Sequence, residues 1–267
     1  MSTSSDAQWL ADTAANYKLS TESAENLAFS LPPLEAAHIV EFLGSGAYGT
    51  AYRLSNDHVL KVSVPGPDPD TGEWPGRRPQ QRGAKAVGLT PHLKSQAAAL
   101  KRLQNDQFAG RAKLRHVAVY DVGTGSFMNM FEEDDDPSWG IRAGDTVQNE
   151  FTYVELAHVQ PLILWLDEQG ISPRRIDRLW RMFKDGTGRH MNAGLLDRMI
   201  QRHRASHPEA RVLRALLRSA LDLTRTTGDI VHDDGRGGLV RSSDVTISNA
   251  GVLHTRGNKP VIVFFDF

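Results

Sequence analysis

The feature that most constrains this chain is a glycine-rich run that reads Gly44-Ser45-Gly46-Ala47-Tyr48-Gly49. Glycines at this spacing let a backbone approach phosphate groups closely, because no Cβ stands in the way. In a dinucleotide-binding turn the same spacing opens a helix. Here the β-type segment 39–43 precedes the run, and a second such segment, 50–54, follows it. The run therefore predicts a β-hairpin that could cradle phosphates, and the other interpretation is an ordinary glycine hairpin.

Lys61 lies in the middle of the next β-type segment, 58–64, between Leu60 and Val62. A strand lysine emerges on one of the two faces of its sheet. On the same side as the glycine hairpin, its ammonium would reach the α- and β-phosphates of a bound nucleotide. On the other side it would be an ordinary exposed lysine. The glycine run before it favours the phosphate role.

The order of elements predicts an α+β fold in which a β-rich lobe with one helix precedes a reduced, mostly helical lobe. The predicted helices are 5–38, 90–106, 161–169, 173–184, 193–204 and 208–226. Further strands are predicted at 117–122, 151–156, 245–247, 251–253 and 260–265. We divide the chain into a helical extension (1–38), an N-terminal lobe with its hinge (39–160) and a C-terminal lobe (161–267). A β-rich lobe followed by a helical lobe is the protein-kinase arrangement.

A second constellation, Asp244 to Asn249, has the Asp-x-x-x-x-Asn spacing of a kinase catalytic loop. Its Asp would accept the proton of the substrate hydroxyl, and its Asn would hold a metal ion. Asp266 directly follows an apolar strand, where the other metal-binding carboxylate is expected. Asp234 competes with Asp244 for the role of base, but the residue five positions later is Leu239 rather than Asn. We therefore favour Asp244.

Tyr153 to His158 reads as a strand that runs into the hinge between the two lobes. Backbone groups from Glu155 to Ala157 would hold the edge of the adenine, with Val154 beside them. A kinase lysine is usually paired with a Glu on the following helix. The helix predicted at 90–106 offers Gln96 and Gln104 instead, so the sequence supplies no evident charge partner for Lys61.

Composition limits the remaining functions. The net charge is −1, so no overall field favours nucleic acid or membrane. The absence of cysteine excludes disulfides and thiolate metal sites and suits a reducing cytoplasm. No apolar stretch approaches the roughly 20 residues of a membrane span. The stretch 174–204 is rich in Arg, and its helix Arg174 to Arg181 reads as a solvated face, with an acidic partner as the alternative. We expect a cytoplasmic protein.

These motifs together resemble the early serine/threonine protein kinases of T-odd podoviral phages. The matching segments are 42–48, 51–52, 59–62, 117–122, 244–249 and 256–262. That family usually has Asp-Pro at the metal-binding position, whereas this chain has Asp266-Phe267. The resemblance implies ATP and Mg²⁺ as cofactors and the phosphorylation of host proteins in the bacterial cytoplasm.

Three functions remain open from the sequence. The first is an active Ser/Thr protein kinase. The second is a pseudokinase-type module that inhibits a host target by binding it, which the missing Glu favours. The third is a small-molecule phosphotransferase, which is disfavoured because Ser242 fills the position where those enzymes usually carry a His.

Overall fold

The computed structural model describes residues 3–13, 19–46, 49–64, 86–109, 117–130, 144, 146–187, 192–227, 230–233, 239–242, 245–254 and 260–265. The chain divides into two compact units. The first comprises residues 1–101, 119–158 and 233–238, and the second comprises residues 102–118, 159–232 and 239–267. Among the described residues, no helix combines the length and the apolar character that a membrane span needs.

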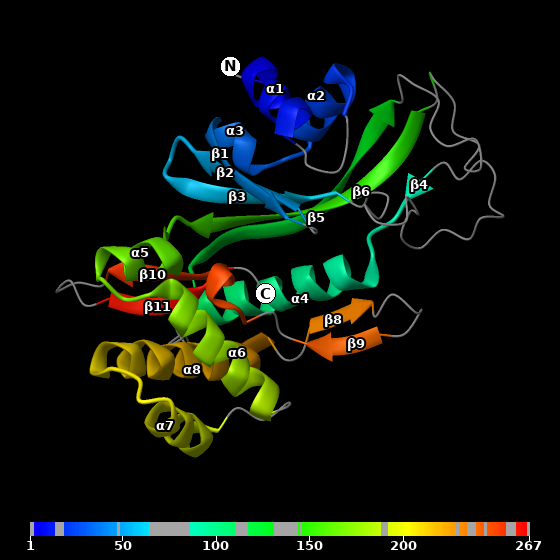
Figure 1. Ribbon diagram of the computed structural model, residues 1–267. Coiled ribbons are helices and arrows are strands. Elements are labelled where there is room, and N and C mark those ends of the chain that lie inside the picture. Colours follow the sequence, from blue (N-terminus) through cyan, green and yellow to red (C-terminus); the bar gives the residue numbers. More distant parts are fainter. Residues whose placement is uncertain are drawn as a thin grey trace. The chain divides into compact units, whose positions relative to one another are not determined.

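An antiparallel sheet of five strands forms the first unit (Figure 1). Its strands, in spatial order, are β1 (Ile39–Gly46), β2 (Gly49–Leu54), β3 (His58–Ser63), β6 (Thr146–Ala157) and β5 (Val119–Met130). A short sixth strand, β4 (Ala86–Val87), pairs parallel to β6 at residues 148–149. The strands and helices together confirm the predicted α+β class.

Strands β5 and β6 are both longer than the sequence predicted. In β5 the reason is that two glycines, which are typical of loops, lie inside the strand. Gly123 is paired with Tyr153, and Gly125 is paired with Phe151. A Cβ at Gly123 would lie 2.7 Å from the Tyr153 ring, and one at Gly125 would lie 2.5 Å from the Phe151 ring. The aromatic rings therefore occupy the space that a side chain on β5 would need, so a larger residue at either position would force the facing ring to move.

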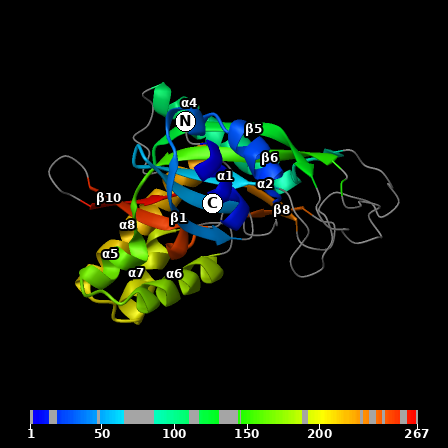
Figure 2. The same ribbon diagram turned by 90° about the horizontal axis from the view of Figure 1, so that it is seen from above.

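Three helices precede the sheet: α1 (Thr3–Thr13), α2 (Thr21–Phe29) and α3 (Pro33–Ala36). Figures 1 and 2 show α1 and α2 lying across one face of the sheet. Their buried side chains belong to the same core as those of the strands, and this core includes Leu10, Leu27, Leu31, Tyr52, Leu60 and Phe151. The N-terminal helices are thus an integral part of the first unit.

Helix α2 also supplies hydrogen bonds to the outer edge of β5. The Oγ of Ser23 accepts a hydrogen bond from the backbone N–H of Met130 at 2.7 Å and donates one to the Met130 carbonyl at 3.3 Å. The Nδ2 of Asn26 donates to the carbonyl of Met128 at 3.3 Å. Polar side chains of α2 therefore satisfy backbone groups that a further strand would otherwise pair with.

Asp6 of α1 fixes the start of β1. Its carboxylate accepts a 2.7 Å hydrogen bond from the backbone N–H of Ile39, and the side chain is buried. Burial raises the pKa of Asp6 above its ordinary value, while the hydrogen bond from Ile39 and the charge of His38 act in the opposite direction.

The second unit combines four helices with a small sheet. The helices are α5 (Leu162–Glu168), α6 (Pro173–Thr187), α7 (Ala193–Arg202) and α8 (His207–Thr227). The sheet has the order β11 (Pro260–Phe264), β10 (Ala250–His254) and β7 (Gln160–Pro161). Helix α8 packs against β11, and the buried Oγ of Ser219 donates to the carbonyl of Ile262 at 2.5 Å. The described part of helix α4 (Pro91–Phe108) is divided between the two units.

Two sequence predictions differ from the structure in the second unit. The strand predicted at 245–247 is wrong: residues 245–246 are irregular, and the 3₁₀ turn η2 (Ile247–Asn249) follows them. A hairpin of β8 (Ile230–Asp233) and β9 (Leu239–Ser242) was not predicted. No strand was predicted there, because its β-type segments are short and rich in polar residues.

Candidate functional site

The glycine run forms the predicted β-hairpin. Gly46 pairs with Gly49, and Gly44 pairs with Ala51. Gly44 and Gly49 have φ angles of +150° and +153°, a region that side chains rarely allow. Ala47 and Tyr48 lie outside the described residues. The described part therefore matches the hairpin interpretation and excludes the helix start of a dinucleotide-binding turn.

Lys61 lies on β3 in a row of directly paired residues that crosses the whole sheet. The row reads Gly44, Ala51, Lys61, Val154 and Val122. Directly paired residues of neighbouring strands project on the same face of a sheet. The side chains that precede and follow Lys61, those of Leu60 and Val62, belong to the core with the N-terminal helices. Lys61 is therefore on the face opposite to those helices, and it shares that face with the start of the glycine run.

The two outer glycines have different surroundings. A Cβ at Gly44 would meet no atom within 4 Å, so the backbone there adjoins open space. A Cβ at Gly49 would lie 2.6 Å from the carbonyl oxygen of Val62. The end of the hairpin thus packs directly against β3, while Gly44 leaves room beside Ala51 for an approaching group. Gly44 and Ala51 have no bulky side chains, and Lys61 beside them is half-buried. This arrangement suits the approach of an anionic ligand.

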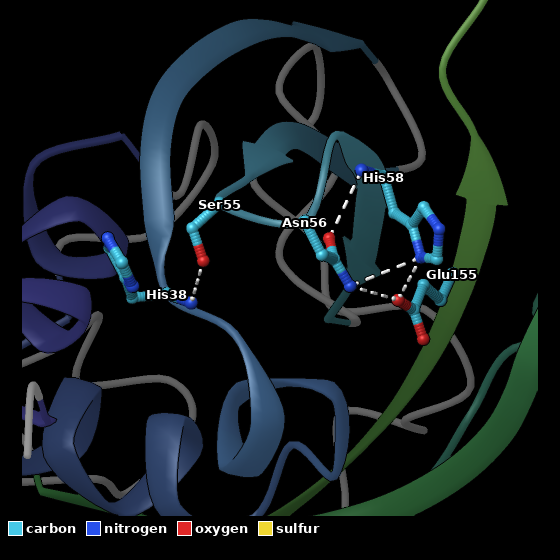
Figure 3. Close-up of polar contacts among 5 residues, drawn as sticks. All are labelled: His38, Ser55, Asn56, His58 and Glu155. Atoms are coloured by element: carbon cyan, nitrogen blue, oxygen red, sulfur yellow. Dashed lines mark hydrogen bonds and ion pairs between the residues drawn. The ribbon is translucent and has the colours of Figure 1, made fainter.

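The Glu155 side chain points to the other face of the sheet. Its Oε1 lies 2.6 Å from Nδ1 of His58 and 3.1 Å from Nδ2 of Asn56 (Figure 3). The His58 ring also stacks on Tyr120, with 3.9 Å between ring centroids. The Glu155 carboxylate is thus engaged away from the face of Lys61. A role of this segment in nucleotide binding would have to use its backbone.

The backbone pairing of β6 changes at its last residue. Leu156 is paired both with Val59 of β3 and with Val119 of β5. Ala157 is paired with His58, and the described ladder with β5 has already ended. Within the predicted hinge segment 155–157, Ala157 is therefore the residue at which the backbone leaves the sheet.

The turn between β2 and β3 is fixed by hydrogen bonds to the segment before β1. The backbone N–H of His38 donates to Oγ of Ser55 at 3.2 Å, and the N–H of Ser55 donates to the carbonyl of His38 at 2.9 Å. Figure 3 shows this pair beside the Asn56, His58 and Glu155 contacts. The sequence carried no signal that Glu155, far along the chain, would bind next to this turn.

In the second unit, Asn249 lies at the end of the β10–β11 hairpin. Its carbonyl oxygen accepts a 3.0 Å hydrogen bond from the backbone N–H of Phe265, and the neighbouring residues Ala250 and Phe264 are paired. Asp266 is the next residue after Phe265 but lies outside the described residues. The structure therefore brings Asn249 next to the residue that immediately precedes Asp266, as expected if both belong to one site.

Trp180 anchors the segment that follows Asp244. Its Nε1 donates a 2.7 Å hydrogen bond to the carbonyl oxygen of Val245, and both residues are fully buried. Helices α5 and α6 both contact η2. Sequence reasoning missed Trp180, because a Trp on the apolar face of a helix indicates a core position and nothing more.

Several predicted site residues cannot be placed. Asp244, its competitor Asp234 and Asp266 all lie outside the described residues, and their roles stay predictions. The described residues contain no cluster of three or more His, Asp or Glu that could hold a metal ion. Helix α4 has no Glu, and its buried polar residues are Gln96 and Gln104.

No protein-family model and no curated protein sequence matches this chain.

Proposed function

We propose that the chain is an ATP-dependent serine/threonine protein kinase. The observation that carries the proposal is the position of Lys61, which lies on the third strand and in the same row as Gly44 and Ala51 of the glycine hairpin. A glycine-rich loop followed by a lysine on the third strand is the arrangement in which protein kinases hold the phosphates of ATP. We assign the phosphates to the hairpin and to the ammonium of Lys61, and the adenine edge to the backbone near Ala157.

The second unit supports the proposal independently. Asn249 and the residue preceding Asp266 are joined by a backbone hydrogen bond, and Val245, next to Asp244, is anchored by Trp180. We assign Asp244 as the group that accepts the proton of the substrate hydroxyl. Asn249 and Asp266 would hold Mg²⁺, which neutralises charge on the phosphates during transfer. The carboxamide and carboxylate oxygens of this pair are ligands that Mg²⁺ accepts.

The class of substrate is a further part of the proposal and depends only on the motif resemblance described above. On that basis the substrates are host proteins in the bacterial cytoplasm. The hydroxyl acceptors would be Ser and Thr side chains.

A second candidate is a binding module that holds nucleotide without efficient transfer. The composition of α4 favours it, because Gln96 and Gln104 can hydrogen-bond to an ammonium but cannot balance its charge. In active kinases the lysine is paired with a Glu on the corresponding helix. In this candidate function the protein binds nucleotide at the same site but does not transfer phosphate efficiently.

Labelled ATP with Mg²⁺, incubated with the protein in the presence and absence of bacterial lysate, tests both candidates. We expect label on proteins, lost in Lys61→Ala and in Asp266→Asn and kept in Lys94→Ala, which changes an exposed lysine of α4. A nucleotide-induced thermal shift without any label would support the binding module. Label on small molecules alone would support a small-molecule phosphotransferase. If neither label nor a thermal shift is observed, nucleotide binding is ruled out.

A further inference from the structure

Positive charge is concentrated in the helical part of the second unit. Residues 173–227 contain thirteen Arg and Lys residues, twelve of them Arg, and five Asp and Glu residues. The net charge of the whole chain is −1, so the remaining residues are strongly acidic in balance. The small net charge of the whole chain is therefore the sum of a basic helical region and an acidic remainder.

One arginine of this region is explained by the fold. The Nε of Arg175 lies 2.6 Å from Oε1 of the buried Glu209, and its guanidinium also donates to the carbonyls of His203 and Arg204. Arg175 thus fastens α6 to the link between α7 and α8. Its guanidinium is therefore engaged within the second unit.

Three arginines of α8 lie on its solvent-exposed side. Arg211, Arg214 and Arg218 are spaced three and four residues apart, so they share one face of the helix. All three are exposed, whereas Leu213, Leu216 and Leu217 on the other side are buried. Figure 1 shows α8 between α7 and the β10–β11 hairpin. We call the three exposed residues the α8 arginine row.

Little in the described part of the chain neutralises the α8 arginine row. Arg214 lies 3.0 Å from Asp197 of α7, but both side chains are about half exposed, and such pairs exchange readily for other anions. Arg211 and Arg218 make no ion pair with any described residue. Helix α8 contains two carboxylates: Glu209, which is engaged by Arg175, and Asp222, which lies four residues after Arg218.

We infer that the α8 arginine row binds the phosphate backbone of duplex DNA without reading its sequence. A row of guanidinium groups along a straight helix matches a polymer with regularly repeated phosphates, and guanidinium binds phosphate oxygens in a bidentate manner. Helix α8 has no Phe, Tyr or Trp on which single-stranded bases could stack. The major groove of B-DNA admits an α-helix, whereas the narrow major groove of duplex RNA does not.

Two other anionic partners fit less well. Helices that bind membrane surfaces present an apolar face beside the basic one, but the apolar face of α8 is buried against β11 and the neighbouring helices. An acidic peptide would not require three equivalent arginines in one line. The row is also independent of the proposed phosphotransfer, since it involves none of the residues assigned to the nucleotide.

Fluorescence anisotropy with a labelled DNA duplex of mixed sequence tests the inference on the full chain. We expect binding whose affinity falls steeply between about 50 and 200 mM salt. In the triple variant Arg211→Gln, Arg214→Gln and Arg218→Gln, we expect affinity at the lower salt to fall by at least about tenfold. The slope of log K against log salt should become shallower by about 2.7, since each lost phosphate contact contributes about 0.9.

Two further variants make the test specific. The variant with Lys at all three positions keeps the charge and should retain most of the binding. The matched control changes Arg174, Arg178 and Arg181 of α6 to Gln, which removes the same charge from another exposed helix face of the second unit. Circular dichroism verifies that each variant is folded. Equal losses in the α8 and α6 variants, no DNA binding by the unaltered chain, or tighter binding to duplex RNA, anionic vesicles or a polyglutamate peptide would overturn the inference.

Discussion

The indole Nε1 of Trp180 donates a 2.7 Å hydrogen bond to the carbonyl oxygen of Val245, across 65 residues of sequence. Both partners are fully buried. The bond joins the middle of α6 to the segment directly after Asp244. The residue proposed as the base therefore directly precedes a residue that is buried and held by a hydrogen bond.

Replacement of Trp180 by Phe is expected to lower the free energy of unfolding by about 1–3 kcal/mol from the unpaired carbonyl alone. The smaller ring of Phe adds to this loss, because the buried atoms around Trp180 lose packing contacts. Urea unfolding measures the effect. The control is Trp165→Phe on α5, where the side chain is half-buried and no described residue bonds its indole. Equal losses in the two variants would show that the Val245 bond contributes nothing.

The glycine hairpin gives a second prediction from the contrast between Gly49 and Gly44. Alanine at either position must adopt a strained positive φ, which costs about 1–2 kcal/mol. Alanine at Gly49 would in addition place its Cβ 2.6 Å from the Val62 carbonyl, so β2 and β3 would have to separate. Urea unfolding should therefore show a clearly larger loss for Gly49→Ala than for Gly44→Ala. A larger loss at Gly44 would contradict the described packing.

The pair of His58 and Glu155 gives a third prediction. Their side chains are 28% and 13% exposed, so solvent screens the interaction only in part. A double-mutant cycle with His58→Gln and Glu155→Gln should yield a coupling free energy of about 1 kcal/mol. Because Glu155 points away from the face of Lys61, the nucleotide-induced thermal shift should survive in Glu155→Gln. Loss of that shift would mean that the carboxylate takes part in nucleotide binding.

The buried carboxylate of Asp6 gives a prediction about pH. Burial raises its pKa in the folded chain above the ordinary value of 3.8, so the folded state binds the proton more tightly than the unfolded state. Asp6 should therefore cost the chain stability as pH rises from about 3.8 through the raised pKa. Below that interval the carboxyl is protonated in both states, and the cost disappears.

The variant Asp6→Asn isolates this effect, since its amide oxygen can still accept the hydrogen bond from Ile39. The difference in unfolding free energy between the variant and the unaltered chain should shift in favour of the variant as pH rises from acid to neutral. All other carboxylates cancel in this difference. A difference that stays constant with pH would show that Asp6 titrates as an exposed residue.

Local patterns predicted much of the first unit. The alternation around Lys61 and the glycine spacing were sufficient to predict the β1–β2 hairpin and β3, because both depend on residues close in sequence. Strand β5 beyond Val122 was not predictable in this way. Its Gly123 and Gly125 are β residues only because Tyr153 and Phe151, far along the chain, lie over them. The sequence alone did not show those contacts.

In the candidate site, too, the features set by residues close in sequence were predictable and the contacts between distant segments were not. The spacing of Asp244 and Asn249 was visible in the sequence, and so was the apolar strand before Asp266. The backbone bond from Phe265 to Asn249 and the anchor from Trp180 to Val245 were not, since both join distant segments. The strand predicted at 245–247 fails for a related reason. Its apolar residues Val245 and Ile247 are buried by contacts with helices rather than by pairing with another strand.

The bonds from Ser23 and Asn26 to β5 have a consequence for solubility. They occupy the open side of a strand that could otherwise pair with the same strand of another molecule. A shortened chain that begins at β1 would uncover this side together with the apolar face beneath α1 and α2. Such a chain is expected to associate into aggregates, so work on the isolated sheet needs to retain the first three helices.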